Sequence, residues 1–266
     1  MIPRNSICAV VGKGGTGKTT ISGLLIKYLN QITDAPLFAI DADPSTCLGD
    51  VLGMKIKETL GDIREDTKDN LDKIPAGMTK KEYLDFQVQS SIIESPKIDL
   101  LTMGRPEGPG CYCYVNNILR NCIDTLSQKY AYTVIDCEAG IEHLSRRTTV
   151  NVDYLFIITD ISIKGIKTVQ IILQLIEKLQ TIARKKILLF NKWGGEIDDK
   201  NIKELLSYVR GDNFTFIGKL PEDKTIIDFE MKGESLLNLP DDSPIFLSFK
   251  EIINNIGSSP KELQQK

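Results

Sequence analysis

The stretch Gly12-Lys13-Gly14-Gly15-Thr16-Gly17-Lys18-Thr19-Thr20 decides how the rest of the chain is built. It follows an apolar run over Ser6–Val11 and leads into residues whose apolar positions recur at helical spacing. A strand, a glycine-rich loop and a helix in this order are typical of a phosphate-binding loop. The glycines let backbone N–H groups converge on phosphate oxygens at the positive end of the helix dipole. The stretch therefore predicts a bound nucleoside triphosphate.

Every residue from Gly12 to Thr20 is a candidate nucleotide contact, and two of them have distinct expected roles. The ammonium group of Lys18 can reach the β- and γ-phosphates, which makes Lys18 a candidate catalytic residue. The hydroxyl group of Thr19 is a candidate ligand of Mg²⁺. We expect ATP or ADP with Mg²⁺ as the cofactors and ATP hydrolysis as the reaction.

Lys13 is not needed by an ordinary phosphate loop, because Lys18 already serves the γ-phosphate within the subunit. In a face-to-face dimer, a lysine at this position can reach the phosphates of the partner, as an arginine finger does in trans. Lys13 is therefore a third candidate for catalysis, and the alternative is a solvated surface lysine. The pattern K-G-G-x-G-K-T-T resembles the deviant phosphate loop of the MinD/ParA/nitrogenase iron protein class of dimerising ATPases.

Composition limits the other possibilities. The chain has 266 residues, 41% of them hydrophobic, a formal charge of −3 and a pI near 5.4. This charge gives no basic field for nucleic acid or anionic lipid. No apolar run approaches the ~20 residues of a membrane span, and the N-terminus does not resemble a signal peptide. We expect a cytoplasmic protein with one ATPase domain over residues 1–257 and a disordered tail over residues 258–266.

Apolar runs rich in β-formers alternate with helical patterns, which predicts an α/β, three-layer fold with a mainly parallel sheet of about seven strands. A clear helical stripe begins at Ile166 and continues to Ile182 through Val169, Leu173, Ile176 and Leu179. The segment Gly53–Ile92 is charged and poorly periodic, so we expect irregular structure there with one helix near Lys80–Val88. The expected strands are Ser6–Val11, Leu37–Asp41, Ile98–Met103, Tyr132–Asp136, Tyr154–Thr159, Ile187–Asn191 and Phe214–Leu220.

Three aspartates follow predicted strands, at the edge of a parallel sheet where ligands bind. Asp43 is the candidate catalytic residue that orients the attacking water, and it also faces the metal. Asp41 is expected to support the Mg²⁺ shell. For both Asp41 and Asp43, capping of the next helix is the alternative. Asp136 ends an apolar strand and occupies the position that holds Mg²⁺ in many nucleotide hydrolases. After it, Cys137–Arg147 is interpreted as a switch segment that contains Gly140 and His143, with His143 in a packing role.

The base can be inferred from Asn191-Lys192-Trp193-Gly194. GTPases carry N-K-x-D here, and the aspartate pairs with guanine; the fourth residue of this chain is Gly194. A missing hydrogen-bonding partner is costly in discrimination, so ATP is favoured over GTP. Asn191 and Lys192 are expected to contact adenine, and Pro221 to form the opposite wall.

Six cysteines and one histidine are present, so a soft-metal site must rest on cysteine. Cys111 and Cys113 follow a glycine- and proline-rich loop and precede a helical run. Two thiolates make half of a four-ligand site, and a two-fold axis would supply the other half. The other cysteines, which we expect to be reduced, small packing residues, are Cys8, Cys47, Cys122 and Cys137.

Taken together, the deviant loop, the D-A-D-P segment, G-x-x-C-x-C before a helix, and D-x-E-A-G-I-E-H-L after a strand resemble the CooC/AcsF family of nickel-insertion ATPases. The resemblance runs from about Ile7 to Gly257. It implies that Cys111 and Cys113 bind Ni²⁺ or Zn²⁺ between two subunits and that Lys13 acts in trans. It also implies a homodimer controlled by ATP and metal, with carbon monoxide dehydrogenase or acetyl-CoA synthase as its client.

Two other functions stay open. A positioning ATPase of the MinD/ParA type needs a lipid-binding tail or a basic DNA-binding face. The C-terminal helix that begins at Pro244 has an apolar face but no basic one, so a packed surface helix is favoured over a membrane anchor. An iron–sulfur scaffold ATPase is the other alternative, although such proteins usually carry C-x-x-C rather than C-x-C.

Overall fold

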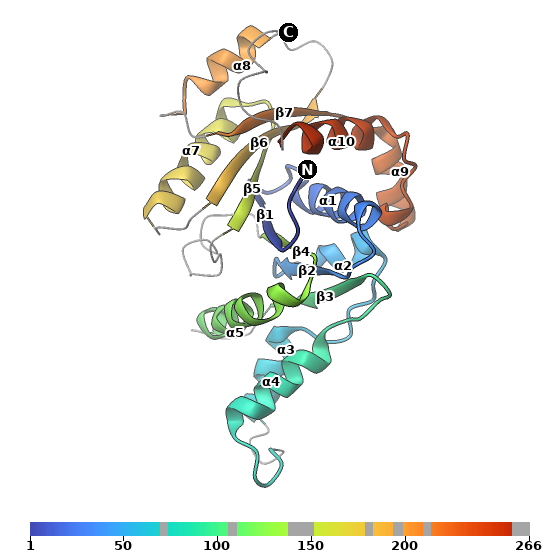
Figure 1. The fold of residues 1–266 in the computed structure, drawn as a ribbon. Coiled ribbons are helices and arrows are strands. Elements are labelled where there is room, and N and C mark those ends of the chain that lie inside the picture. The colour runs from blue at the N-terminus through green and yellow to red at the C-terminus, as the bar shows by residue number, and fades with distance from the viewer. Residues whose placement is uncertain are drawn as a thin grey trace.

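The computed structural model describes residues 1–69, 74–105, 111–137, 152–178, 183–193, 199–209 and 214–256. Its strands form one parallel, seven-stranded sheet in the order β3-β2-β4-β1-β5-β6-β7 (Figure 1). The predicted fold class is confirmed. The strands are β1 (Ser6–Gly12), β2 (Leu37–Ala42), β3 (Ile98–Thr102), β4 (Tyr132–Cys137), β5 (Val152–Thr159), β6 (Ala183–Trp193) and β7 (Phe216–Pro221).

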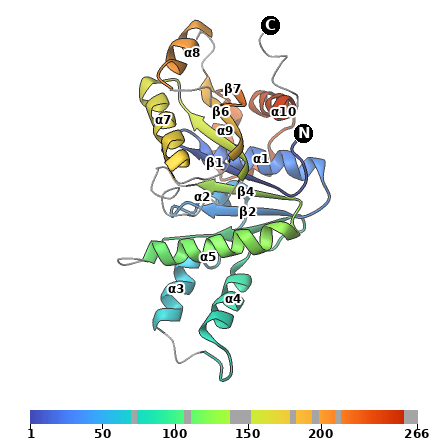
Figure 2. The same ribbon diagram turned by 60° about the vertical axis from the view of Figure 1, so that its left-hand side comes forward.

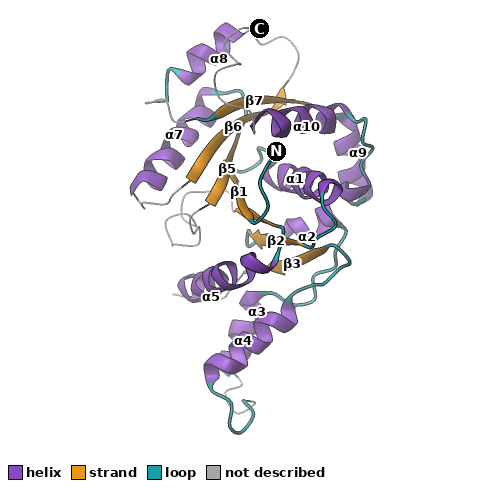
Figure 3. Ribbon diagram, viewed as in Figure 1, coloured by secondary structure: helices purple, strands orange, loops and turns teal. Residues whose placement is uncertain are grey.

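Helices cover both faces of the sheet, as the purple and orange ribbons of Figure 3 show. The α-helices are α1 (Lys18–Ile32), α2 (Cys47–Leu52), α3 (Leu60–Asp69), α4 (Lys80–Ser91), α5 (Cys111–Leu126), α7 (Ile163–Lys178), α8 (Asp199–Leu206), α9 (Lys224–Lys232) and α10 (Pro244–Ile256). Short 3-10 turns are η2 (Ser127–Lys129) and η3 (Leu236–Asn238). Helices α1 and α10 pack on one face, and α5 and α7 on the other (Figure 1).

Alternation along the strands builds two cores, one on each side of the sheet. In β1, Cys8 and Val10 face the core under α1 and α10, whereas Ala9 and Val11 face the core under α5 and α7. This follows from the two-residue period of a strand. Both cores are lined by fully buried aliphatic and aromatic side chains, so β1 is fixed from both sides and holds the loop that follows it.

The segment Gly53–Ile92 is more regular than its sequence indicates. The helix expected near Lys80–Val88 is present as α4, but α3 before it was not predicted. Figure 2 shows α3 and α4 projecting together beyond α5, away from the sheet. Leu60 and Ile63 of α3 are buried against the core under α5, and these few apolar anchors are too sparse to give a helical stripe.

The C-terminal helix α10 packs against the body of the protein. Its apolar face, Ile245, Phe246, Phe249, Ile252, Ile253 and Ile256, is buried in the core that α1 covers. The predicted packed surface helix is therefore confirmed. Among the described helices, none has the length and apolar character to cross a membrane. The proposed tail from residue 258 lies outside the described residues, as do Leu179 and Ile182 of the stripe carried by α7.

Candidate nucleotide site

The glycine-rich loop leaves the carboxyl end of β1, the central strand, and enters α1. Gly12 has φ +153°, and a Cβ atom there would collide with the carbonyl oxygen of Ile158, its neighbour on β5. Gly17 has φ +88°, and a Cβ atom there would collide with Nδ2 of Asn191. Both positions therefore require glycine, because the backbone needs left-handed geometry and because a neighbouring strand approaches closely. The loop is thus in close contact with β5 at Gly12 and with β6 at Gly17.

A cavity of about 660 Å³ opens over this loop. One end is lined by residues of the loop and of α1, including Lys18, which is only 7% exposed; these are Gly14, Gly15, Gly17, Lys18, Thr19 and Thr20. The other end lies between the ends of β6 and β7, at Asn191, Lys192 and Pro221. The cavity therefore brings together the predicted phosphate contacts and the predicted base contacts. Gly12, Lys13 and Thr16 are not among its lining residues.

Asn191 joins the two ends of the cavity. Its Nδ2 atom donates to the carbonyl oxygen of Thr16 at 2.8 Å, which fixes the amide plane. Its Oδ1 atom is buried and has no hydrogen-bond partner in the described part of the chain. Lys192, next along the strand, has φ +56°, at an irregularity in the β6–β7 pairing. Because the Nδ2 atom of Asn191 is held, its Oδ1 atom is an unused hydrogen-bond acceptor at the end of the cavity where the base is expected. Gly194 lies outside the described residues.

Asp136 lies at the phosphate end, where β4 ends. Its Oδ1 atom accepts from the hydroxyl of Ser22 at 2.8 Å, and Thr19 also hydrogen-bonds to this carboxylate. Its Oδ2 atom is buried and unpartnered among the described residues. Burial raises the pKa of Asp136 to about 6, although these hydrogen bonds and the charge of Lys18 oppose the rise. A carboxylate with an unused oxygen, beside the Thr19 hydroxyl, suits a divalent cation that prefers oxygen ligands.

Asp41 has a different environment from the one predicted. It is fully buried, and its two carboxylate oxygens accept the backbone N–H groups of Asp43 at 3.1 Å and Leu48 at 2.9 Å. These contacts favour the alternative role, in which Asp41 caps the start of α2. Burial first, and then the charge of Asp136, raise the pKa of Asp41 to about 7. A part for Asp41 in the Mg²⁺ shell stays a prediction.

Asp43 is presented to the cavity by the turn that Asp41 holds. Its Oδ1 atom accepts the N–H of Ser45 at 2.8 Å, and its carbonyl oxygen accepts the N–H of Thr46. Thr46 has φ +54°, a strained conformation for a β-branched residue, and such strain concentrates at functional loops. The loop thus aims Asp43 at the same space as Lys18 and Thr19.

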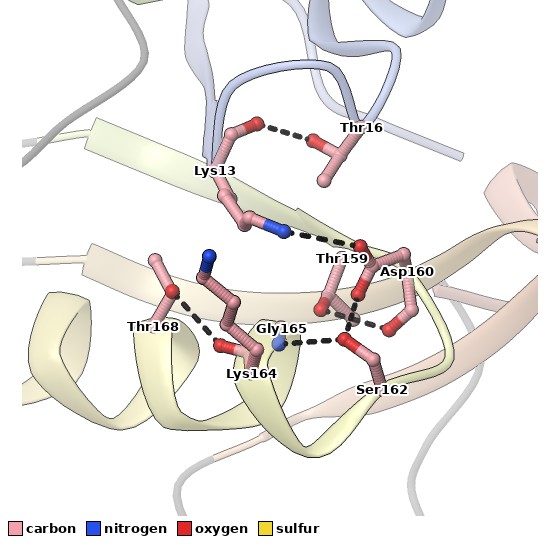
Figure 4. A network of polar contacts seen from close by, with 8 residues as sticks. All are labelled: Lys13, Thr16, Thr159, Asp160, Ser162, Lys164, Gly165 and Thr168. Atoms are coloured by element: carbon pink, nitrogen blue, oxygen red, sulfur yellow. Dashed lines mark hydrogen bonds and ion pairs between the residues drawn. The ribbon is translucent and has the colours of Figure 1, made fainter.

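Lys13 is bound within its own chain. Its Nζ atom lies 3.4 Å from Oδ2 of Asp160, which follows β5, and the two side chains are 32% and 42% exposed. Figure 4 shows Ser162 completing the arrangement: its hydroxyl contacts Oδ1 of Asp160 at 2.5 Å and accepts the N–H of Gly165 in α7. Sequence reasoning missed Asp160, because nothing in a strand-end aspartate indicates which lysine it will meet.

The cysteines separate into three groups. Cys8, Cys122 and Cys137 are buried and unpaired, as predicted. Cys47 corrects the prediction: it begins α2, is exposed and lines the cavity, because this short helix turns its first residue away from the core. Cys111 and Cys113 begin α5, but their side chains lie outside the described set. Among the described side chains, no group of three or more His, Cys, Asp or Glu gathers to hold a metal ion.

The parallel sheet, the loop after its central strand and the paired carboxylates at its carboxyl edge define a P-loop nucleotide hydrolase. Residues 7–237 match the CobQ/CobB/MinD/ParA nucleotide binding domain, and the chain belongs to that family of ATPases.

The switch segment expected over Cys137–Arg147, with Gly140 and His143, lies outside the described residues except for Cys137.

Relatives agree with this assignment. An uncharacterized ATP-binding protein of Methanocaldococcus jannaschii is 44% identical over 94% of this chain and 98% of its own. The carbon monoxide dehydrogenase accessory protein CooC of Rhodospirillum rubrum is 29% identical over 87% of this chain and 89% of its own. The septum site-determining protein MinD of Pyrococcus horikoshii, solved with Mg-ADP, matches with a TM-score of 0.68 at 19% identity, covering 95% of each chain.

Proposed function

We propose that this ATPase is a metallochaperone, in which ATP binding and hydrolysis switch a homodimer that carries Ni²⁺ or Zn²⁺. In this proposal Cys111 and Cys113 of two subunits hold the ion, and the cargo is nickel for carbon monoxide dehydrogenase or acetyl-CoA synthase. The observation that carries the proposal is the similarity to CooC along almost the whole chain, together with two cysteines at the start of α5.

The nucleotide half of the proposal follows from the cavity. Backbone N–H groups of the loop and the Lys18 ammonium would bind the phosphates, and the bare Oδ1 of Asn191 would accept the amino group of adenine. Guanine has an oxygen at that position, which would repel Oδ1, so adenine is preferred. Lys192 and Pro221 would form the walls around the base.

Hydrolysis needs a positioned water and charge compensation. The residues that would hold Mg²⁺ are Thr19 and Asp136, with Asp43 facing them; when bound, this ion neutralises charge on the phosphates. Asp43 would orient the attacking water, and Lys18 would stabilise the transferred phosphoryl group. Lys13 of each subunit would act on the phosphates of the partner, which couples hydrolysis to the dimer.

ATP binding and hydrolysis would then control whether the metal ion is held. In the proposed dimer the two pairs of thiolates face each other across the two-fold axis and complete a four-sulfur shell. Separation of the subunits after hydrolysis leaves two ligands on each, too few to retain the ion. The cycle would therefore release cargo to the client enzyme.

Metal content per subunit tests this proposal. Anaerobically purified protein is titrated with Ni²⁺ or Zn²⁺, with and without a nonhydrolysable ATP analogue, and bound ion is measured by elemental analysis beside light scattering. We expect one ion per two chains, lost in the Cys111→Ser/Cys113→Ser double variant, while the Cys8→Ser/Cys122→Ser variant retains it. Tightly bound iron with sulfide would instead support a scaffold, and one ion per monomer that survives the Cys111/Cys113 change would refute the interfacial site.

A positioning ATPase is the second candidate. The family includes MinD and ParA, and Maintenance of carboxysome distribution protein A of Gloeothece citriformis is 27% identical over 64% of this chain and 62% of its own. The buried apolar face of α10 removes one membrane-binding surface that this candidate would use. Co-sedimentation with DNA or with anionic vesicles in the presence of ATP tests it, and binding to either would favour it over the metallochaperone.

A further inference from the structure

Two residues that follow β3, Met103 and Gly104, connect separate parts of the molecule. The N–H group of Met103 donates to the carbonyl oxygen of Asp41 at 2.8 Å, at the start of the turn that presents Asp43 to the cavity. The carbonyl oxygen of Met103 accepts the N–H group of Gly61, in the first turn of α3, at 2.9 Å. Met103 is fully buried. Its backbone therefore links the nucleotide cavity to α3.

Gly104 and Thr59 approach each other closely. Gly104 has φ +67°, a left-handed conformation that favours glycine, and a Cβ atom there would collide with the side chain of Thr59. Thr59 is itself fixed at the start of α3. Its N–H group and its hydroxyl donate to Oδ2 of Asp62 at 2.9 and 2.8 Å, and the hydroxyl accepts the N–H of Asp62 at 3.2 Å. Gly104 and the start of α3 therefore cannot shift independently.

Helix α3 also contacts α5, the helix whose first turn contains the two candidate metal ligands. Leu60 and Ile63 of α3 are fully buried in the same core as Val115 and Leu119 of α5. Gly104, in turn, comes shortly before the metal ligands in the chain. Thus α3 contacts both the chain that leads to these ligands and the helix that contains them.

We propose that Thr59 is a positioning residue: its fit against Gly104 couples the nucleotide cavity to the start of α5, where the candidate metal ligands lie. The inference rests on the function proposed above. Nucleotide bound at Asp43 shifts the turn after β2, and the backbone of Met103 carries this shift to the end of β3. The contact with Thr59 then carries it to α3 and α5. Closely packed side chains and short hydrogen bonds transmit such a displacement, because they leave no free space to absorb it.

Three variants isolate this contact. Gly104→Ala breaks the fit, because its methyl group meets Thr59. Gly77→Ala is the matched control: Gly77 lies between α3 and α4 with φ +89°, so alanine is strained there too, but nothing lies within 4 Å of the added methyl group. Gly104→Ala/Thr59→Gly keeps the strain at Gly104 but removes all three side-chain atoms that the methyl group would meet. This double variant should therefore restore the fit.

Hydrogen exchange with and without Mg-ADP tests the coupling without hydrolysis or ATP-driven dimerisation. In the wild type and in Gly77→Ala, we expect Mg-ADP to slow exchange of amides in α3 and α5 by about fivefold or more. In Gly104→Ala the effect should fall to within about twofold, although calorimetry should give an ADP affinity near that of the wild type. The double variant should regain most of the response. A change in fold stability alone would not make the response depend on nucleotide.

Zinc titration connects the same contact to the metal. The affinity for Zn²⁺ is measured by calorimetry with and without a nonhydrolysable ATP analogue. The analogue should strengthen zinc binding about tenfold or more in the wild type and in Gly77→Ala. In Gly104→Ala this gain should be about fivefold smaller, while the stoichiometry of one ion per two chains is unchanged.

The outcomes separate the two proposals. An exchange response in Gly104→Ala equal to that of the wild type, or no response in the wild type, overturns the role of Thr59 and leaves the metallochaperone proposal standing. Absence of bound zinc in the wild type refutes the metallochaperone proposal, and hydrogen exchange still decides whether Thr59 couples the cavity to α5. If Gly104→Ala does not fold by circular dichroism, Thr59→Gly, which leaves a gap instead of a collision, replaces it. A lost response is again the supporting result.

Discussion

The ammonium of Lys13 is paired with the carboxylate of Asp160 in the same chain, at 3.4 Å. Lys13 is proposed to act on the phosphates of a partner, but here it is paired within its own chain, with Asp160 directly after β5, as Figure 4 shows. In the proposed dimer, this pair must separate before Lys13 can reach the partner across the two-fold axis. The strength of the ion pair would then set a cost that the proposed ATP-driven dimerisation has to overcome.

Asp160→Asn should make ATP-driven dimerisation easier. The change removes the charge that holds Lys13 but retains the size of the side chain beside Ser162. A partly exposed ion pair is worth up to about 1 kcal/mol, so the dimerisation constant should rise up to about fivefold for each site. Sedimentation with a nonhydrolysable ATP analogue measures it. Asp34→Asn, which breaks the exposed ion pair with Lys97, is the matched control and should change nothing.

Lys13→Gln should leave ADP affinity near that of the wild type, since Lys18 completes the phosphate site within one subunit. Dimerisation with ATP and the rate of hydrolysis should both fall, the latter by about a thousandfold if Lys13 acts as a finger in trans. Light scattering and a phosphate-release assay give the two values. A variant that dimerises and hydrolyses ATP normally would reduce Lys13 to a surface charge.

Lys18→Ala should weaken nucleotide binding strongly, by roughly ten- to a hundredfold. The side chain is buried at the phosphate end of the cavity, and a charge-assisted hydrogen bond is worth about 1.5–3 kcal/mol, or roughly ten- to a hundredfold in affinity. Calorimetry with ATP and Mg²⁺ measures the loss. Lys97→Ala removes a lysine from a remote, exposed ion pair and should bind as the wild type does. Unchanged affinity in Lys18→Ala would place the phosphates elsewhere.

Asp43→Asn should bind ATP with near-normal affinity and hydrolyse it about a hundredfold or more slowly, as expected for loss of a water-orienting carboxylate. Single-turnover hydrolysis separates the chemical step from binding. Asp50→Asn is the matched control, because Asp50 lines the same cavity and its substitution removes the same charge. If both variants turn over at the wild-type rate, Asp43 does not orient the water.

Gly17→Ala should weaken ADP binding far more than Gly15→Ala. Both glycines have positive φ, +88° and +79°, so an alanine is strained at either position. Only at Gly17 does the added methyl group collide with another side chain, Nδ2 of Asn191, whereas nothing lies within 4 Å of it at Gly15. The difference between the two variants, read by calorimetry and thermal unfolding, isolates that contact. Equal losses would mean that backbone strain alone explains the requirement for glycine.

Much of the fold could be predicted because its signals are local. Apolar runs predicted all seven strands. The glycine-rich loop after Val11 indicated that the strand before it leads into the nucleotide site. The strand that begins at Ala183 is longer than predicted, because Lys185 and Lys186 interrupt its apolar pattern while still pairing with β5. Helix α3 was missed for a similar reason, since its charged residues conceal two buried anchors.

The site was harder to predict wherever it depends on residues that are distant in the sequence. Asp136 and Thr19 were expected at the site from their motifs. The capping role of Asp41 was only the alternative, since its two oxygens are filled by backbone N–H groups that only the folded turn presents. The hydrogen bond from Thr20 to Glu230 of α9 gave no signal either, because a single glutamate on an amphipathic helix resembles any solvent-exposed residue. Its partner Thr20 lies 210 positions away in the chain.

The bond from Asn191 to the carbonyl of Thr16 means that the two halves of the cavity are shaped before any nucleotide arrives. The conformational entropy of these residues is lost when the protein folds, so little more is lost when the ligand binds. The heat-capacity change on ADP binding should then reflect burial of the nucleotide alone, without a contribution from ordering of this part of the chain. The affinity for nucleotide therefore depends on how firmly the folded protein holds these two halves in place.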